Sequence, residues 1–238
     1  MPHKKILLAL TLFLLLSTGC TAQPVSDISS APQQVIRVGL PPVLSYLVQP
    51  LSTCADDSPV YDIVLLEKNS PDWVQEPIDM VFTLGQALPN VTNTYLIDNA
   101  SIQIIASPDF SLDTLTMQQL QQLYAADGQP EDLPGSFTLW GFENNSEMAG
   151  LFRQQYQFKP DLPGQAYLAA TPQLMTESIA RGQMAVGYTL SGAVTQDVKL
   201  IKVTDAPSAD PVPVIASVIL QPSPAQEDLL RCLQSPQD

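Results

Sequence analysis

The sequence predicts an α/β fold, in which a sheet is covered by helices. Short runs rich in Val, Ile and Leu indicate strands, and between them apolar residues recur at the three- and four-residue spacing of an amphipathic helix. Such alternation is typical of a sheet with helices on both faces. With 45% apolar residues, the 238-residue chain has enough material for a packed core, which excludes general disorder.

Five strands are expected in the first part of the folded region. They cover residues 35–40, 61–66, 78–84, 94–97 and 102–106. Pro41 and Pro42 end the first strand, because proline has no N–H to donate to a neighbouring strand. A helix follows, with apolar residues at helical spacing between 44 and 51, and Pro50 is expected to kink or end it.

The second part alternates further strands with four helices. The strands cover residues 137–142, 184–190, 198–203 and 214–220. The helices begin at residues whose side chains accept hydrogen bonds from free backbone N–H groups, namely Thr116, one of Asn144 to Ser146, Thr171 and Ser223. Gln119 completes a capping box with Thr116, and Gly182 ends the third of these helices.

The N-terminus has the features of a secretory signal peptide. Two lysines precede an apolar run at residues 6–16, which is too short to span a bilayer comfortably, and small residues follow. The sequence LSTGC at residues 16–20 resembles the lipobox of bacterial lipoproteins. This resemblance implies removal of residues 1–19 and acylation of Cys20. The alternative is plain secretion with an incidental cysteine.

Residues 20–34 are expected to form a flexible tether. The segment is rich in Ser, Pro and Gln and has no periodic apolar residues. Fully extended, it would reach about 50 Å from the membrane. The expected location is therefore extracytoplasmic, with the lipid on Cys20 anchoring the chain to a bacterial membrane.

Charge and composition exclude several classes of function. The chain has 24 acidic and 10 basic residues, and its net charge of −14 argues against nucleic-acid binding. The single histidine, His3, lies in the expected signal peptide, so the mature chain has no histidine for a catalytic triad or a metal site. No phosphate-binding Gly-rich loop, dinucleotide motif or EF-hand pattern occurs in the sequence. We therefore expect that the protein is not an enzyme and that it has no metal site and no cofactor.

Cys54 and Cys232 remain once Cys20 is set aside. An even pair of cysteines in an oxidising compartment favours a disulfide, which here would join the first helix to the last. A loop of this length would contribute up to ~4–5 kcal/mol on the chain-entropy model. The alternative is two separate buried thiols.

Four stretches of the chain carry a resemblance to a known family. They are VIRVGLPPVLSYLVQPL from residue 35, LTMQQLQQLYA from 115, WGFENNSEMAGLF from 140 and LMTESIARGQMAVGY from 174. In this order they resemble the periplasmic binding proteins of the phosphate-binding type. They cover most of residues 35–220, and their order and spacing are more specific than any one of them alone.

The resemblance implies a two-lobed, type II periplasmic-binding-protein-like fold with a ligand cleft between hinged lobes. Lobe 1 would hold residues 35–104 and 190–238, and lobe 2 would hold residues 105–189. Proteins of this type supply a solute to an ABC-type importer. The implied partners are therefore a small-molecule solute in the cleft and an ABC permease, with the binding protein acting as a monomer.

The sequence departs from this family where phosphate would be held. Carried over by position, the family's arginine falls on Phe142, and its Gly-Ser-Gly-Thr stretch falls on residues 145–148, where only Ser146 matches. The hydroxyl donors at the first strand fall on residues 40–42, which offer no side-chain donor. Glu147 would place a negative charge beside the anion. The sequence therefore predicts weak or absent phosphate binding.

The residues left at the expected cleft suit a neutral or partly apolar ligand. The candidate contacts are Leu40, Pro41, Thr83, Asn144, Asn145, Ser146, Tyr188 and Thr189. Tyr188 or Phe142 would stack on the ligand. Each has a structural alternative: Tyr188 would pack at the hinge, Phe142 would fill space left by the ligand, and the Asn and Ser side chains would only cap their helix.

Two functions stay open at this point. The first is an extracytoplasmic solute-binding lipoprotein of an ABC-type importer, related to phosphate-binding proteins but without most of their phosphate donors. The second is an accessory or sensory interaction module that has the same fold and binds no ligand in its cleft.

Overall fold

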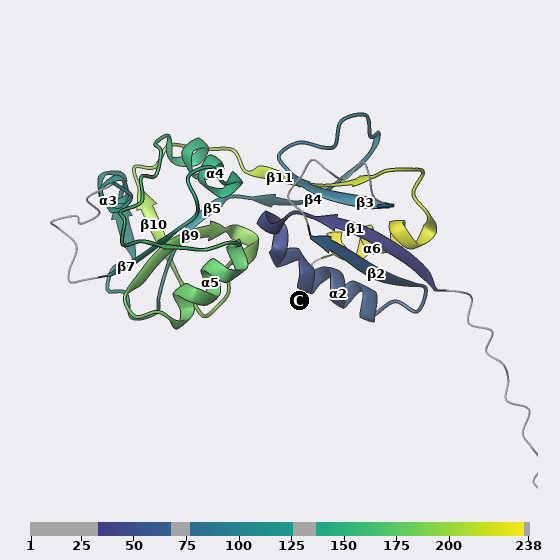
Figure 1. Cartoon of the computed structure of the whole chain (residues 1–238), viewed down its shortest axis with the longest axis horizontal. Helices are drawn as coiled ribbons and strands as arrows, with labels where there is room; N and C mark the ends of the chain where they lie inside the picture. Colours follow the sequence, from purple (N-terminus) through teal and green to yellow (C-terminus); the bar gives the residue numbers. More distant parts are fainter. Residues whose placement is uncertain (1–32, 68–76, 126–136, 236–238) are drawn as a thin grey trace, which may run out of the picture. The chain divides into compact units, whose positions relative to one another are not determined.

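The computed structural model describes residues 33–67, 77–125 and 137–235, which form two mixed sheets flanked by helices (Figure 1). The expected α/β fold is therefore confirmed. The expected signal peptide, the acylated Cys20 and the tether up to residue 32 lie outside the described residues. Within them, no helix is long and apolar enough to cross a bilayer.

The first sheet has the strand order β2-β1-β3-β11-β4. Its strands are β1 (Gln34–Leu40), β2 (Tyr61–Glu67), β3 (Met80–Leu84), β4 (Asn93–Ala100) and β11 (Val212–Val218). β1 pairs in parallel with β2 and β3, whereas β11 runs antiparallel to β3 and β4. Ile36, Val38 and Leu40 of β1 are buried, so this strand forms the centre of the local core.

The chain after β1 forms two consecutive helices. The 3-10 helix η1 (Pro42–Leu47) runs directly into α2 (Val48–Asp56). Pro50 lies in the first turn of α2, where a missing N–H removes no intrahelical hydrogen bond. The expectation that Pro50 kinks or ends a helix is therefore wrong. The irregular backbone lies earlier, at Leu44 (φ −104°, ψ 19°).

A disulfide joins the two helices that pack beside the first sheet, α2 and α6 (Pro224–Gln234). It connects Cys54 to Cys232, whose Cα atoms lie 6.0 Å apart although 178 residues separate them in sequence. Cys54 is buried, and the hydroxyl of Tyr61 donates to its backbone carbonyl over 3.1 Å. The bond thus joins the helices that the sequence analysis paired.

The second sheet has the strand order β6-β10-β5-β9-β7-β8. Its strands are β5 (Ile102–Ala106), β6 (Thr114–Thr116), β7 (Thr138–Gly141), β8 (Tyr167–Leu168), β9 (Ala185–Leu190) and β10 (Lys199–Thr204). Its helices are α3 (Met117–Leu123), α4 (Glu147–Tyr156) and α5 (Pro172–Arg181). A short 3-10 turn, η3 (Ser191–Ala193), follows β9.

Helices cover both faces of β9, and all six of its residues are buried. On one face, α5 packs so closely that a Cβ on Gly187 would lie 2.7 Å from the sulfur of Met175. On the other face, the ring of Tyr188 packs against Phe152 of α4 with the ring centroids 4.5 Å apart. Because β-strand side chains alternate between faces, Tyr188 and Gly187 must serve opposite sides of this sheet.

Strand pairing corrects the expected lobes in two places. β10 pairs antiparallel with β5 and in parallel with β6, so it belongs to the second sheet and not to the first lobe, where residues 190–238 were placed. The expected boundary after residue 104 also cuts through β5. Both errors arise because chain order does not reveal which strand a returning segment pairs with. The division of the remaining residues into lobes stays a prediction.

The predicted helix starts are confirmed. Thr116 forms the capping box with Gln119, Ser146 accepts from the N–H of Ala149, and Thr171 accepts from the N–H of Leu174. Ser223 forms a second capping box. Two short strands, β6 and β8, were not predicted.

Candidate functional site

A cavity of about 730 Å³ lies where η1, the β7–α4 loop and the β8–α5 connection come together. We call it the cleft. It is lined by Pro41, Pro42, Val43, Phe142, Glu143, Asn145, Ser146, Glu147, Met148, Leu168, Ala169, Ala170 and Pro172. Its volume lies within the range of small-molecule sites. Apolar and polar atoms contribute about equally to its surface, and the polar side chains come from the β7–α4 loop and the start of α4.

Three helix starts meet at the cleft, but they offer few free backbone donors. A helix N-terminus normally presents N–H groups to an anion. Here Pro42 and Pro172 occupy the first positions of η1 and α5 and have no N–H. At the start of α4, the side chain of Ser146 accepts from the N–H of Ala149 over 3.2 Å, so this donor is already used.

The charge of the cleft disfavours an anion. No Lys, Arg or His is among the residues that line it, whereas Glu143 and Glu147 are. Glu147 is exposed overall, but its carboxyl is partly desolvated, which raises its pKa. An incoming phosphate would meet two carboxylates without a compensating cation.

Three of the residues expected to contact ligand line the cleft: Pro41, Asn145 and Ser146. The other five do not. Asn144 is exposed beside it, and its carbonyl accepts from the guanidinium of Arg153 over 3.4 Å. Leu40, at 1% exposure, belongs to the core. The hydroxyl of Thr83 is buried and has no partner among the described residues.

Tyr188 packs inside the second sheet and not in the cleft. Its ring lies 5.2 Å from the Phe142 ring and 5.5 Å from the Tyr124 ring, between centroids, and the residue is fully buried. Burial raises the pKa of its hydroxyl, with the nearby Phe142 backbone and Arg153 opposing that shift. The hydroxyl has no partner with hydrogen-bond geometry in the described part of the chain. In this structure only Phe142 of the two expected stacking residues reaches the cleft.

Thr189 does not line the cleft but contacts the helix start that forms one of its walls. It is fully buried and donates to the carbonyl of Pro172 over 3.0 Å. Thr176 of α5 donates to the same carbonyl over 3.2 Å. These bonds fix the start of α5, which forms one wall of the cleft, so Thr189 has a structural role here.

Sequence reasoning missed one wall of the cleft. Leu168, Ala169, Ala170 and Pro172 lie on the connection from β8 into α5, and Val43 and Glu143 extend the other walls. The predicted helix start at Thr171 was the available signal. If this helix start had been expected to face the other two, residues 168–172 would have been predicted to line the cleft.

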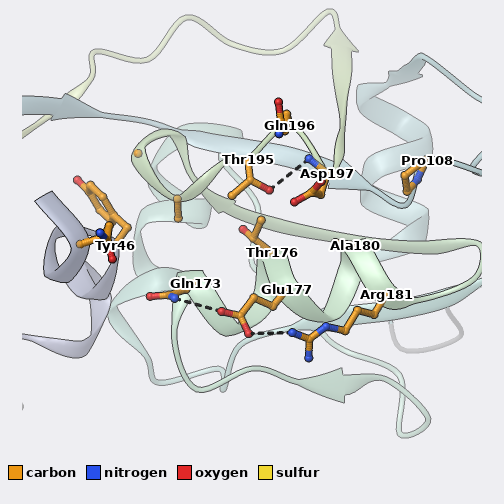
Figure 2. A pocket seen from close by; sticks show the side chains of 13 residues that line it. Tyr46, Pro108, Gln173, Thr176, Glu177, Ala180, Arg181, Thr195, Gln196 and Asp197 are labelled. Carbon is orange, nitrogen blue, oxygen red and sulfur yellow. Dashed lines mark hydrogen bonds and ion pairs between the residues drawn. The ribbon is translucent and has the colours of Figure 1, made fainter. Parts of the chain in front are cut away.

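A second cavity, of about 710 Å³, shares no lining residue with the cleft (Figure 2). We call it the groove. It lies between α5 and the turn at Thr195–Asp197, with Tyr46 of η1 at one end and Pro108 at the other. Neither cavity offers a metal site: across residues 33–67, 77–125 and 137–235, no three His, Cys, Asp or Glu side chains gather as ligands.

The fold is similar to solved binding proteins and to a regulatory domain. A protein assigned as a phosphate ABC transporter substrate-binding protein from Clostridium perfringens, solved with bound phosphate, superposes with a TM-score of 0.64 at 13% identity, covering 85% of this chain and 93% of that one. An ABC-type phosphate transport receptor from Vibrio cholerae gives 0.53 at 14% identity, covering 84% and 93%. The reduced OxyR regulatory domain from Pseudomonas aeruginosa gives 0.57 at 13% identity, covering 85% and 98%.

These similarities establish the fold. The chain has a type II periplasmic-binding-protein-like fold, as the sequence predicted. No family model matches the sequence, and no curated protein matches it. At such low identity the function of any one neighbour does not transfer, and the neighbours include both solute-binding proteins and regulatory domains.

Proposed function

We propose that this chain is an extracytoplasmic solute-binding lipoprotein whose cleft takes an uncharged, partly apolar solute and not phosphate. One observation carries the choice of solute: the cleft combines apolar and polar surface in about equal shares, with two glutamates and no cation among its lining residues. The fold, shared with solute-binding proteins, supports a binding role. The signal peptide and lipobox in the sequence support the location and the anchor on Cys20.

The expected binding mode follows from the lining. Pro41, Leu168 and Ala170 are exposed or half-buried and would contact the apolar part of the solute. Phe142, at 2% exposure, lies beneath this surface. Asn145 supplies an amide that both donates and accepts hydrogen bonds. Ser146 already accepts from Ala149, but its hydroxyl proton can still be donated to a ligand.

A thermal-shift screen of the full-length chain in detergent tests this proposal. The panel holds phosphate, sulfate, molybdate, amino acids, sugars and small uncharged aromatics. A solute at 100 times its dissociation constant stabilises the folded state by about 2.7 kcal/mol, which is readily measured. Stabilisation by an uncharged compound and none by the inorganic anions is the expected result. Tight phosphate binding would overturn the proposal.

Two variants locate the binding. Ala170→Trp places a large side chain at an exposed position of the cleft wall and should abolish the stabilisation. Ala206→Trp is the matched control, since Ala206 is also exposed but lies outside the cleft lining. Stabilisation that is retained in Ala170→Trp would show that the solute binds elsewhere.

Delivery to an ABC permease is the further part of this proposal. It rests on the resemblance of the sequence and on neighbours that belong to ABC transport systems. Co-purification from detergent-solubilised membranes, followed by mass spectrometry, should recover a permease with the lipidated chain. A Cys20→Ala variant, which would not be anchored, should lose this recovery.

The second candidate is an accessory or sensory module that binds no solute. The similarity to a regulatory domain favours it, as does the loss of phosphate donors at the helix starts. Under this alternative, every compound of the panel leaves the melting temperature unchanged, and the co-purified partner is not a transporter.

A further inference from the structure

The groove is lined by several side chains that carry a carboxamide. Three glutamines, Gln49, Gln173 and Gln196, lie around it, and Thr195 adds a hydroxyl. All four are exposed. Each glutamine carries a carbonyl acceptor and two N–H donors, so the set can pair with groups that both donate and accept. Hydroxyl groups of a ligand have this property.

Small residues leave room between these polar groups. Ala180, Gly192 and Ala193 line the groove without filling it, and the Tyr46 ring closes one end. Figure 2 shows Gln173, Glu177 and Arg181 along α5 and Thr195, Gln196 and Asp197 on the turn opposite. A ligand lying between the two would meet polar side chains from both walls.

The charges of the groove disfavour an anionic ligand. Arg181 is its only cationic lining residue, and its guanidinium lies 3.8 Å from a carboxylate oxygen of Glu177. The other oxygen of Glu177 accepts from the amide of Gln173 over 3.1 Å. Asp197 adds a second carboxylate on the opposite wall. An anion would be repelled, whereas carboxylates readily accept from hydroxyl donors.

We infer that the groove is a second binding site, for a neutral, hydroxyl-rich solute of the saccharide class. Carboxamides and carboxylates, with apolar surface between them and the Tyr46 ring at one end, enclose about 710 Å³, which suits the size and the mixed polar and apolar faces of a disaccharide. The site is separate from the cleft, because the two cavities share no lining residue. It therefore stands whether or not the cleft binds the solute proposed above.

Residue-resolved NMR on the full-length, isotope-labelled chain in detergent tests the inference. Maltose, trehalose and the N-acetylglucosamine disaccharide are the probes, each titrated to the limit of its solubility. At least one probe should shift the side-chain amide signals of Gln173 and Gln196 and the backbone signals of Thr195–Asp197. Shifts confined to the cleft, or none with any probe, would overturn the inference.

Paired variants separate binding from a general effect. Gln173→Ala with Gln196→Ala removes two carboxamides from opposite walls and should weaken binding at least about tenfold. The control, Gln121→Ala with Gln122→Ala, removes two exposed glutamines of α3 and should leave the affinity unchanged. Ala170→Trp in the cleft should leave it unchanged as well. Retained affinity in the Gln173/Gln196 variant would contradict the site.

Discussion

Two buried tyrosines differ in whether their hydroxyl groups are paired. Tyr124 donates to the carbonyl of Trp140 over 3.3 Å, whereas Tyr188 has no partner among the described residues. A buried hydroxyl without a partner keeps its desolvation cost and gains nothing in return. Tyr188→Phe should therefore leave the free energy of unfolding unchanged or raise it by up to ~1 kcal/mol, as measured by urea denaturation.

Tyr124→Phe is the matched comparison and should lower that free energy by ~0.5–1.5 kcal/mol, because it leaves the Trp140 carbonyl unpaired. Both changes keep the aromatic packing around Phe152. If Tyr188→Phe proved the more destabilising of the two, the Tyr188 hydroxyl would have to be satisfied, for example by a buried water.

Glu147 should make stability depend on pH. Burial raises the pKa of its carboxyl above the usual 4.5, so the folded state holds its proton more tightly than the unfolded state does. The contribution of this group to stability therefore falls as pH rises through the range just above 4.5. Glu147→Gln cannot ionise, so its melting temperature relative to the wild type should be more favourable at about pH 7 than at about pH 4.

Glu143→Gln removes the same charge from the same cleft and reports the contribution of net charge alone. The opposite result is a melting temperature of Glu147→Gln that falls relative to the wild type as the pH rises. It would mean that the attraction between the ionised carboxylate and the start of α4 outweighs the cost of burying the charge.

The sequence placed Tyr188 and Thr189 at the ligand, and the structure places both inside the protein. A strand that leads towards a cleft was recognised correctly, but the strand is covered on both faces. No alternation of polar and apolar residues marks such a strand, so its last side chains cannot be assigned to a face from the sequence. Ser146 lines the cleft as expected, because the start of its helix can be located from its cap, and its contact with a ligand stays a prediction.

At the scale of elements, we expect the disulfide between α2 and α6 to make a large contribution to the free energy of unfolding. It joins α2 to α6 across 178 residues, and cross-linking so long a loop removes much of the freedom of the unfolded chain. The double variant Cys54→Ser, Cys232→Ser should lower the free energy of unfolding by up to ~4–5 kcal/mol. Urea denaturation with and without reductant measures the effect.

Reductant should destabilise the wild type and leave the double variant unchanged. Insensitivity of both would mean that the two thiols are not bonded in the purified protein. Because Cys54 is buried, complete reduction requires partly denaturing conditions, and the two proteins should be compared at the same urea concentration.

Elements with local signals were predictable, and elements that depend on distant partners were not. The capping boxes at Thr116 and Ser223 mark helix starts from four residues alone. β6 and β8, with three and two residues, exist because β10 and β7 lie beside them. The assignment of β10 to a sheet has the same cause, since only its pairing with β5 decides it.

At the scale of the whole folded unit, the segments that follow β1 and β9 meet where Tyr46 of η1 packs against Gly192 of η3. A Cβ on Gly192 would overlap the Tyr46 ring. The hydroxyls of Ser45 and Tyr46 are buried there without partners among the described residues, and burial, with Asp98 nearby, raises the pKa of Tyr46. Steric fit at Gly192 therefore limits how closely η1 and η3 approach.

A double-mutant cycle tests this contact. Gly192→Ala should lower the free energy of unfolding by ~1–3 kcal/mol, because the added methyl group must displace the ring. In a Tyr46→Ala background the same change should cost little, so the two substitutions should be coupled by most of that amount.

Gly164→Ala is the control: a Cβ there meets no atom within 4 Å, and the variant should be as stable as the wild type or slightly more so. An equal cost of Gly192→Ala in both backgrounds would mean that the backbone of η3, and not the Tyr46 ring, requires glycine. A coupled result would show that the Tyr46 ring sets how closely η1 and η3 approach at Gly192, a pair of residues that lines the groove and not the cleft.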